Sequence, residues 1–100
     1  MNVRFEWDPN KAASNRQKHG ISFPLATRVF ADPFAVSFPD RVVDGEQRWQ
    51  TIGMVDGVLL LLAAYTVTDE TDGTERIRII SARRADRHER RRYEDENGEL

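Results

Sequence analysis

The stretch Arg48–Thr68, RWQTIGMVDGVLLLLAAYTVT, decides the fold because it holds two apolar segments joined by one tight turn. The turn is Asp56-Gly57, a residue pair that favours a two-residue type I′ hairpin, in which both positions take a positive φ. We therefore expect two antiparallel strands, Arg48–Val55 and Val58–Thr68. The second strand is apolar on both faces, and such a strand belongs in the centre of a sheet.

Shorter strands are expected on both sides of this hairpin. Residues 3–7 alternate apolar and polar side chains. Residues 34–38, FAVSF, also read as a strand, which Pro39-Asp40 ends before a polar loop at 41–47. Glu75–Ala82 is the last strand. Its alternation places Arg76 and Arg78 on one face and two isoleucines on the other.

Three helices are expected from their terminal residues. Each pattern begins with a side chain that caps the first turn, and the first two also contain a residue that stops the last turn. The signals are Asp8-Pro9 before a helix that ends at His19-Gly20, Ser22 before a helix that Asp32-Pro33 ends, and the capping box Asp86-x-x-Glu89 before a last helix. The order of elements predicts an α+β domain with an antiparallel sheet, two N-terminal helices and one C-terminal helix.

Length and composition bound the function. The chain has 100 residues, of which 39% are hydrophobic and 32% are charged, and it contains no cysteine. We expect one domain over residues 1–100, with residues 96–100 frayed, and neither a disulfide scaffold nor a fully disordered chain. The N-terminus has no hydrophobic leader and the longest apolar run is too short to span a bilayer, so we expect a cytoplasmic protein.

The net charge of -2 conceals a strong asymmetry along the chain. Residues 76–92 hold eight arginines against two carboxylates, whereas residues 93–100 hold four carboxylates and no basic side chain. Guanidinium groups bind phosphate through two parallel hydrogen bonds, which favours a local nucleic-acid site. The same run is compatible with a solvated helix face of Glu–Arg pairs, and the charge alone does not choose between the two.

The chemistry available to the chain does not depend on a metal motif. The two histidines, His19 and His88, lie outside any metal-ligand spacing, so no metal ion or cofactor is expected. Metal-free RNA cleavage fits better, because the 2′-OH of RNA is the nucleophile and the protein supplies a base, an acid and cations. His19, Glu46 and Tyr93 are acid–base candidates, and Trp49 offers a ring for base stacking.

Each candidate also has an ordinary structural explanation. His19 is favourable as the last residue of a helix, where a cation faces the negative end of the helix dipole. Trp49 on a strand is most often a core residue, and Tyr93 can close the core from the last helix. Arg48 can form a loop ion pair with Glu46. None of these residues decides the function alone.

Four motifs taken together resemble the BrnT family of toxins. In chain order they are Phe5-Glu6-Trp7-Asp8-Pro9-x-Lys11-Ala12 with Asn15 and Lys18–Phe23, then Ala31-Asp32-Pro33, then Glu46-x-Arg48-Trp49-x-Thr51-Ile52-Gly53, and last Arg76–Ala85 with Glu89-Arg90-x-x-Tyr93-Glu94. The resemblance spans Val3 to about Asp95. The ordered set of motifs makes it specific, because any single motif is weak.

The resemblance implies the toxin half of a type II toxin–antitoxin pair with a RelE-like fold. It implies a metal-independent endoribonuclease that inhibits translation, with RNA as substrate, a BrnA-like antitoxin as partner, and operator DNA bound only through the antitoxin. Together with the chemistry above, it gives His19, Glu46, Arg48, Arg83 and Arg84 as the expected catalytic residues. The expected RNA-binding residues are Trp49, Arg76, Arg78, Arg91 and Tyr93.

The chain departs from the family pattern after its long strand. Relatives often carry an arginine shortly after the aromatic residue, whereas Tyr65–Glu70, YTVTDE, contains none. If that arginine binds phosphate in relatives, this chain is a weakened enzyme. The alternative function is therefore a catalytically weak module that binds the antitoxin and acts mainly in operon autoregulation.

Overall fold

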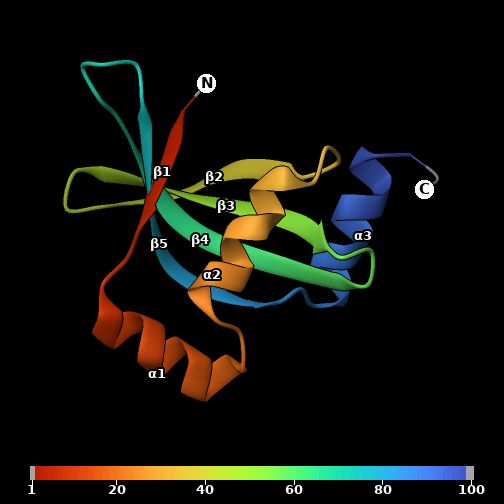
Figure 1. Ribbon diagram of the computed structural model, residues 1–100. Helices are drawn as coiled ribbons and strands as arrows, with labels where there is room; N and C mark the ends of the chain where they lie inside the picture. The colour runs from red at the N-terminus through yellow and green to blue at the C-terminus, as the bar shows by residue number, and fades with distance from the viewer. Residues whose placement is uncertain (1, 99–100) are drawn as a thin grey trace.

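Five strands form one sheet in the order β1-β5-β4-β3-β2 in the computed structural model, which describes residues 2–98 (Figure 1). The strands β2 to β5 pair antiparallel, so the expected meander is confirmed, and the long apolar strand β4 lies at its centre. The strands are β1 Val3–Glu6, β2 Val36–Val43, β3 Glu46–Val55, β4 Leu59–Asp69 and β5 Glu75–Arg84. The helices are α1 Pro9–His19, α2 Phe23–Ala26, the 3-10 helix η1 Thr27–Ala31, and α3 Arg87–Glu96. The expected fraying of residues 96–100 falls in part on residues 99–100, which lie outside the described residues.

The first strand runs parallel to its neighbour, unlike the other four. β1 pairs with β5 from Val3 opposite Glu75 to Glu6 opposite Arg78, and the sheet is therefore mixed. A parallel pair needs a long crossover, which the chain provides because α1, α2, η1 and three strands separate β1 from β5. Alternation in the sequence identifies this strand but carries no information about its partner.

The β2–β3 hairpin is longer than its sequence pattern predicts. The expected loop over residues 41–47 is wrong, because β2 continues to Val43 and β3 already begins at Glu46. Asp44-Gly45 forms the turn with φ of 52° and 78°, close to the 55° and 72° of the expected Asp56-Gly57 turn. The register shifts after Pro39, and this bulge accommodates a residue that donates no ladder hydrogen bond.

The helix termini follow the expected capping residues. The Asp8 carboxylate accepts a backbone N–H at 2.9 Å, and Gly20 ends α1 with a φ of 72°. Ser22 caps α2, which tightens into η1 after four residues. Asp86 and Glu89 form a reciprocal capping box at the start of α3. Among the helices that residues 2–98 form, none is long and apolar enough to cross a bilayer.

The two faces of the sheet are covered unequally. Face A, the side of Tyr65 and Ile77, packs against α2 and η1 and forms the larger core. Face B, the side of Ile52 and Arg78, is covered at one end only, where α3 buries Tyr93 against Ile52 (Figure 1). The opposite end of face B carries no helix within residues 2–98. This end of the sheet positions the site described below.

A glycine allows η1 to approach the sheet closely. A Cβ atom at Gly53 of β3 would lie 2.7 Å from both the carbonyl oxygen and the Cβ of Val29 in η1. Carbon atoms do not approach one another this closely, so any larger residue would push η1 away from face A. The glycine inside this strand is therefore a packing requirement and not a turn signal.

Helix α1 lies along the edge of β5 beyond the end of β1. The buried Asn15 side chain donates to the Ala82 carbonyl at 2.8 Å and accepts from the Ala82 N–H at 3.1 Å. It also donates to the Ile21 carbonyl at 3.2 Å. A side-chain amide thus imitates a neighbouring strand, and it satisfies backbone groups that an uncovered sheet edge would leave to water.

The Asp32 carboxylate fastens α3 to the sheet. One oxygen accepts from the Met54 N–H at 2.8 Å and from the Tyr93 hydroxyl at 2.7 Å, and the other accepts from the Phe34 N–H at 2.9 Å. Burial alone would raise the pKa of Asp32, but the hydrogen bonds from Met54, Phe34 and Tyr93 outweigh it and hold that pKa below its ordinary value. The anion is therefore the form that the fold stabilises.

Ionisation of Tyr93 should weaken the fold at alkaline pH. Burial and the hydrogen bond to Asp32 raise the pKa of Tyr93 from 10.0 to about 12. The neutral phenol therefore contributes its full stability below about pH 10, and the contribution is lost as the pH rises through 12. Tyr93→Phe should lower the free energy of unfolding by about 1–2 kcal/mol at neutral pH, and it should then lose less stability than the parent between these pH values.

Denaturant unfolding at a series of pH values measures both effects. Tyr65→Phe is the matched control, because it removes a buried hydroxyl but leaves Tyr93 in place, and it should keep the steep alkaline limb. If the free energy of unfolding fell equally with rising pH in the parent and in Tyr93→Phe, Tyr93 would not be the group responsible for the alkaline loss of stability.

Candidate nucleic-acid interface

Two arginines flank the central strand on the open part of face B. Arg78 of β5 lies directly opposite Thr66 of β4. On the other side of β4, Trp49 of β3 lies opposite Tyr65, so the preceding residue of β3, Arg48, comes level with Thr66. Arg48 and Arg78 therefore project from the same face on either side of Thr66. Their strands are about 10 Å apart, two strand spacings, so two extended arginine side chains can reach one phosphate between them.

Neither of these guanidinium groups forms an ion pair within the described residues, although Glu6 of β1 lies opposite Arg78 and binds Arg76 instead. Within residues 2–98, the ion pairs include neither Arg48 nor Arg78. The Arg48 Nε is buried and has no hydrogen-bond acceptor, while Arg78 is exposed. A buried donor without an acceptor costs about 1–3 kcal/mol, and an anion placed over this part of the sheet would remove that cost.

A stacked cation–aromatic pair borders the same surface. The Arg92 guanidinium of α3 lies 3.8 Å from the centre of the Phe38 ring of β2. Phe38 pairs with Gln50, two residues after Arg48 on face B. The pair adds a positive charge and an apolar ring to this edge of the open surface. Sequence reasoning missed it, because no local pattern predicts that α3 reaches β2.

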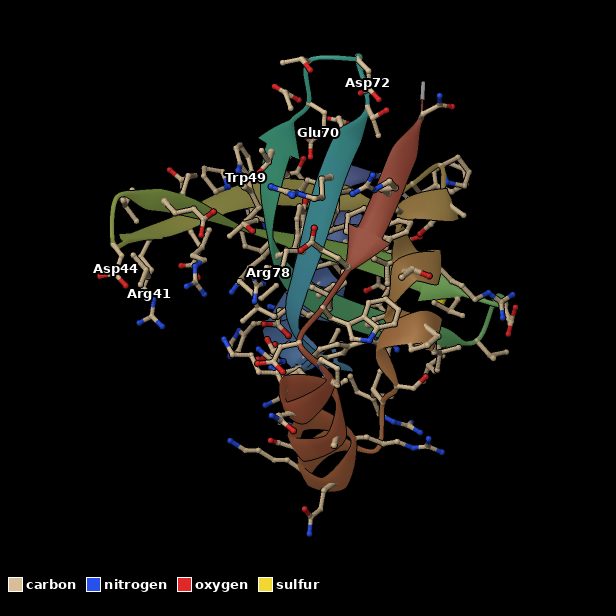
Figure 2. The ribbon with its side chains drawn as sticks, turned by 60° about the vertical axis from the view of Figure 1, so that its left-hand side comes forward. Arg41, Asp44, Trp49, Glu70, Asp72 and Arg78 are labelled. Carbon is tan, nitrogen blue, oxygen red and sulfur yellow. The ribbon has the colours of Figure 1, made fainter. Side chains whose placement is uncertain are left out.

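An exposed carboxylate lies on the same strand and the same face. Glu46 precedes Arg48 by two residues, about 7 Å along β3. Figure 2 shows Arg41 and Arg78 on one side of the β2–β3 hairpin and Trp49 on the other. Arg41 was not among the expected site residues, because the expected loop at 41–47 gave it no fixed direction. The open part of face B therefore combines several cations with one carboxylate.

Arg83 is already paired within the protein. Its two terminal nitrogens donate to the two carboxylate oxygens of Glu89 at 2.8 and 2.9 Å. These hydrogen bonds raise the pKa of the Arg83 guanidinium, although partial burial opposes the shift. Glu89 also accepts from the Asp86 N–H at 2.8 Å, so Arg83 ties the end of β5 to the first turn of α3. Both of its terminal nitrogens thus already bind a carboxylate within the protein.

The other arginines of the run from 76 to 92 have different surroundings. Arg76 lies between two carboxylates, with its Nε 3.1 Å from Glu6 and 3.3 Å from Glu70. Arg84 is exposed at the end of β5, on the face opposite Arg83. Arg91 is exposed on α3 and lines a shallow hollow with His88, Arg92 and two carboxylates. Arg76 thus shares face B with Arg78 but is already held by two carboxylates, whereas Arg84 projects from the other face.

Three expected site residues lie elsewhere. Tyr93 is 4% exposed and its hydroxyl is bonded to Asp32, which leaves no ring face for a base. Trp49 is half-buried on face A, where it packs against the larger core. His19 is the half-buried last residue of α1, at the edge of β5. The structure thus brings together Glu46, Arg48 and Arg78, and it separates them from Trp49 and Tyr93. Within residues 2–98, no three His, Cys, Asp or Glu side chains gather as metal ligands do.

Comparisons with known proteins agree with this fold. Residues 7–89 match the family model described as "Ribonuclease toxin, BrnT, of type II toxin-antitoxin system". The structure is also similar to the 1.1 Å crystal structure of the Brucella abortus ribonuclease toxin BrnT, with a TM-score of 0.64 and 27% sequence identity. That match covers 87% of this chain and 100% of the Brucella chain. A search of curated proteins gives no match.

Replacing Arg83 should destabilise the protein, because the residue holds α3. We expect Arg83→Ala to lower the free energy of unfolding by about 1 kcal/mol. The loss is modest because solvent at the exposed part of the ion pair screens its charges. For a domain of this size the melting temperature falls by roughly 4–8 °C. Arg84→Ala removes a neighbouring exposed guanidinium and should melt like the parent. Equal melting temperatures of the two variants would show that the Arg83–Glu89 pair contributes nothing to stability. Arg83 would then again be a candidate to bind phosphate.

Proposed function

The chain belongs to the BrnT family of ribonuclease toxins of type II toxin–antitoxin systems, and from this premise we propose that it cleaves RNA on the open part of face B without a metal ion. The single observation that carries the placement is the Arg48–Arg78 pair. Both guanidinium groups lack carboxylate partners within residues 2–98, and one buried Arg48 donor lacks any acceptor. A phosphate diester supplies the missing charge and acceptors.

The proposed reaction uses the 2′-OH of the RNA. The 2′ oxygen attacks the adjacent phosphorus, its proton passes to a base, the bond from phosphorus to the 5′ oxygen breaks, and an acid protonates that oxygen. Negative charge accumulates on the phosphate oxygens in the transition state, and Arg48 and Arg78 stabilise it from both sides. Glu46 is assigned the base, because it is the exposed carboxylate on the same strand face.

The stacked pair extends the RNA contact beyond the cleaved bond. Phe38 under Arg92 offers a ring and a planar cation at one border of the surface, and both stack on nucleobases. Single-stranded RNA fits such a surface, because its unstacked bases and its backbone are both accessible. The assignment leaves out Trp49, Arg76, Arg83 and Tyr93, and it gives His19, Arg84 and Arg91 no direct contact with the scissile phosphate.

The biological role follows the family. We propose that RNA cleavage inhibits translation in the cytoplasm, and that a BrnA-like antitoxin neutralises the toxin. Operator DNA is bound through the antitoxin only, because a chain with a net charge of -2 is poorly suited to binding duplex DNA by itself.

A second candidate function is favoured by the composition of β4. Thr66 lies between Arg48 and Arg78, and no arginine occurs from Tyr65 to Glu70. With one cation fewer at the phosphate, the transition state is less stabilised, and the chain would act as a catalytically weak antitoxin-binding module. The two candidates differ in whether the isolated chain cleaves RNA.

Arg48→Ala and Arg78→Ala test the proposed site directly. Each should reduce cleavage of single-stranded RNA by the purified protein by roughly 100-fold or more, because each removes a cation from the transition state. Each should also reduce the dependence of RNA affinity on salt. Arg16→Ala removes an exposed arginine of α1 and should leave both quantities unchanged.

Growth and RNA integrity after induced expression supply the cellular test. Growth arrest with RNA fragmentation in the parent, lost in both face B variants, supports the ribonuclease. Normal growth with folded parent protein supports the weak module. Arrest that persists in both variants with intact folds would place the active site elsewhere.

Cleavage should persist after metal removal. The purified protein should cut RNA at an unchanged rate in excess chelator, because protein side chains and the 2′-OH supply every proton transfer and charge in the proposed reaction. The cut ends should carry a cyclic phosphate. Loss of cleavage in chelator, with full recovery on adding Mg²⁺, would contradict the mechanism.

A further inference from the structure

A second surface lies on face A, opposite the proposed RNA site. The strand register stacks three short rows of side chains at one end of face A, and η1 reaches the second row, where the Phe5 and Phe30 rings lie 5.5 Å apart. Val3, Glu75 and Asp69 lie side by side across β1, β5 and β4, and Phe5, Ile77 and Val67 form the next row. Trp49 beside Tyr65 begins the third. We call Val3, Phe5, Trp49, Val67, Asp69 and Glu75 the strip.

The first row contains an unfavourable pair. Asp69 and Glu75 are directly opposite each other on neighbouring strands, and like charges in this position destabilise a sheet. Within residues 2–98 neither carboxylate is part of an ion pair, although Arg76 nearby binds Glu6 and Glu70. No ion pair of residues 2–98 offsets this repulsion, and a cation bound from outside would reduce it.

Two hollows adjoin this carboxylate pair. One, of about 420 Å³, is lined by Trp49, Tyr65 and Val67 together with both Asp69 and Glu75. The other, also of about 420 Å³, is lined by Val3, Phe5 and Phe30 and shares Glu75. Val3 and Phe5 are 40% and 37% exposed, which is unusual for neighbouring large apolar side chains. Aromatic rings under carboxylates form a receptor for a guanidinium or ammonium group.

We propose that the strip is the docking surface for the antitoxin, and that an arginine or lysine of the antitoxin enters the hollow between Asp69, Glu75 and Trp49. Apolar side chains of the same antitoxin segment cover Val3 and Phe5. The occupant is a basic, apolar protein segment and not RNA, because the carboxylate pair repels phosphate. The inference rests on the family's toxin–antitoxin pairing and adds the place and chemistry of the contact.

The arrangement separates two functions onto two faces. The strip shares no residue with the surface of Arg48, Arg78 and Arg92, which faces the other way. Figure 2 shows Trp49 of the strip on one side of the β2–β3 hairpin and Arg78 on the other. Antitoxin binding and RNA cleavage are therefore separable by substitution. The antitoxin reaches the RNA surface only by extending around the edge of the sheet.

The test measures the affinity of the purified antitoxin, encoded in the same operon, for variants of the full chain. Asp69→Asn and Glu75→Gln preserve shape and should each weaken antitoxin binding by roughly tenfold or more. Their melting temperatures should equal or exceed that of the parent, because the like-charge pair is removed. A loss of affinity without a loss of stability is a result that a purely structural role does not produce.

Matched controls fix the interpretation. Glu94→Gln removes an exposed carboxylate of α3 and should leave the affinity unchanged. Val3→Glu should abolish most binding, whereas Val58→Glu, at a position 81% exposed in the β3–β4 turn, should not. Unchanged affinity in folded Asp69→Asn and Glu75→Gln, or an antitoxin that does not bind the parent, would overturn the proposal.

RNA cleavage by the same variants distinguishes the two proposals. The strip variants should cleave RNA as the parent does and should resist neutralisation. If the parent does not cleave RNA but the strip variants still lose the antitoxin, the proposed function fails and the docking surface stands. If the parent cleaves RNA and the strip variants bind the antitoxin normally, the reverse holds.

Discussion

The carboxylate of Asp32 is the interaction on which the arrangement of the sheet faces depends. It joins three parts of the chain through the N–H groups of Phe34 and Met54 and the hydroxyl of Tyr93. Helix α3 is otherwise strongly polar, and Tyr93 is its one buried residue. The helix is held to the sheet by this cluster, by the Arg83–Glu89 pair, by Arg92 on the Phe38 ring and by the Asn97 amide on the Phe34 carbonyl. It covers one end of face B, and the other end carries no helix within residues 2–98.

The positive charge of the open half of face B follows from the alternation of side chains along a β-strand. Successive side chains point to opposite faces, so Arg78 projects from face B while Ile77 and Ile79 enter the core of face A. The same rule places Arg48 and Trp49, which are adjacent in sequence, on opposite faces. A chain that is nearly neutral overall thus carries a cationic surface on one side and an acidic, aromatic surface on the other. Each surface suits a different class of partner.

Local signals in the sequence predicted most of the elements, and they failed where the decisive contact is distant. Asp56-Gly57, Asp8, Ser22 and the Asp86–Glu89 box act over a few residues, and the structure confirms each. The partner of β1 depends on residues about 70 positions away, and no alternation pattern encodes it. The second hairpin turn, Asp44-Gly45, carries the same signal as the first, but Pro39 obscured it by interrupting the strand pattern. A bulge removes that conflict, and bulges have no reliable sequence signature.

The candidate site shows the same division between residue type and surroundings. The sequence identified an arginine-rich run, yet a carboxylate that already holds a guanidinium competes with phosphate for it. Arg76 and Arg83 are identical in type to Arg78, and both are held by glutamates that come from other elements. Arg48 lies outside the run and carries the unsatisfied buried donor. The free arginines are thus selected by the fold, through the placement of Glu6, Glu70 and Glu89. The sequence identifies the arginines, but the packing of the folded chain determines which of their guanidinium groups a ligand can reach.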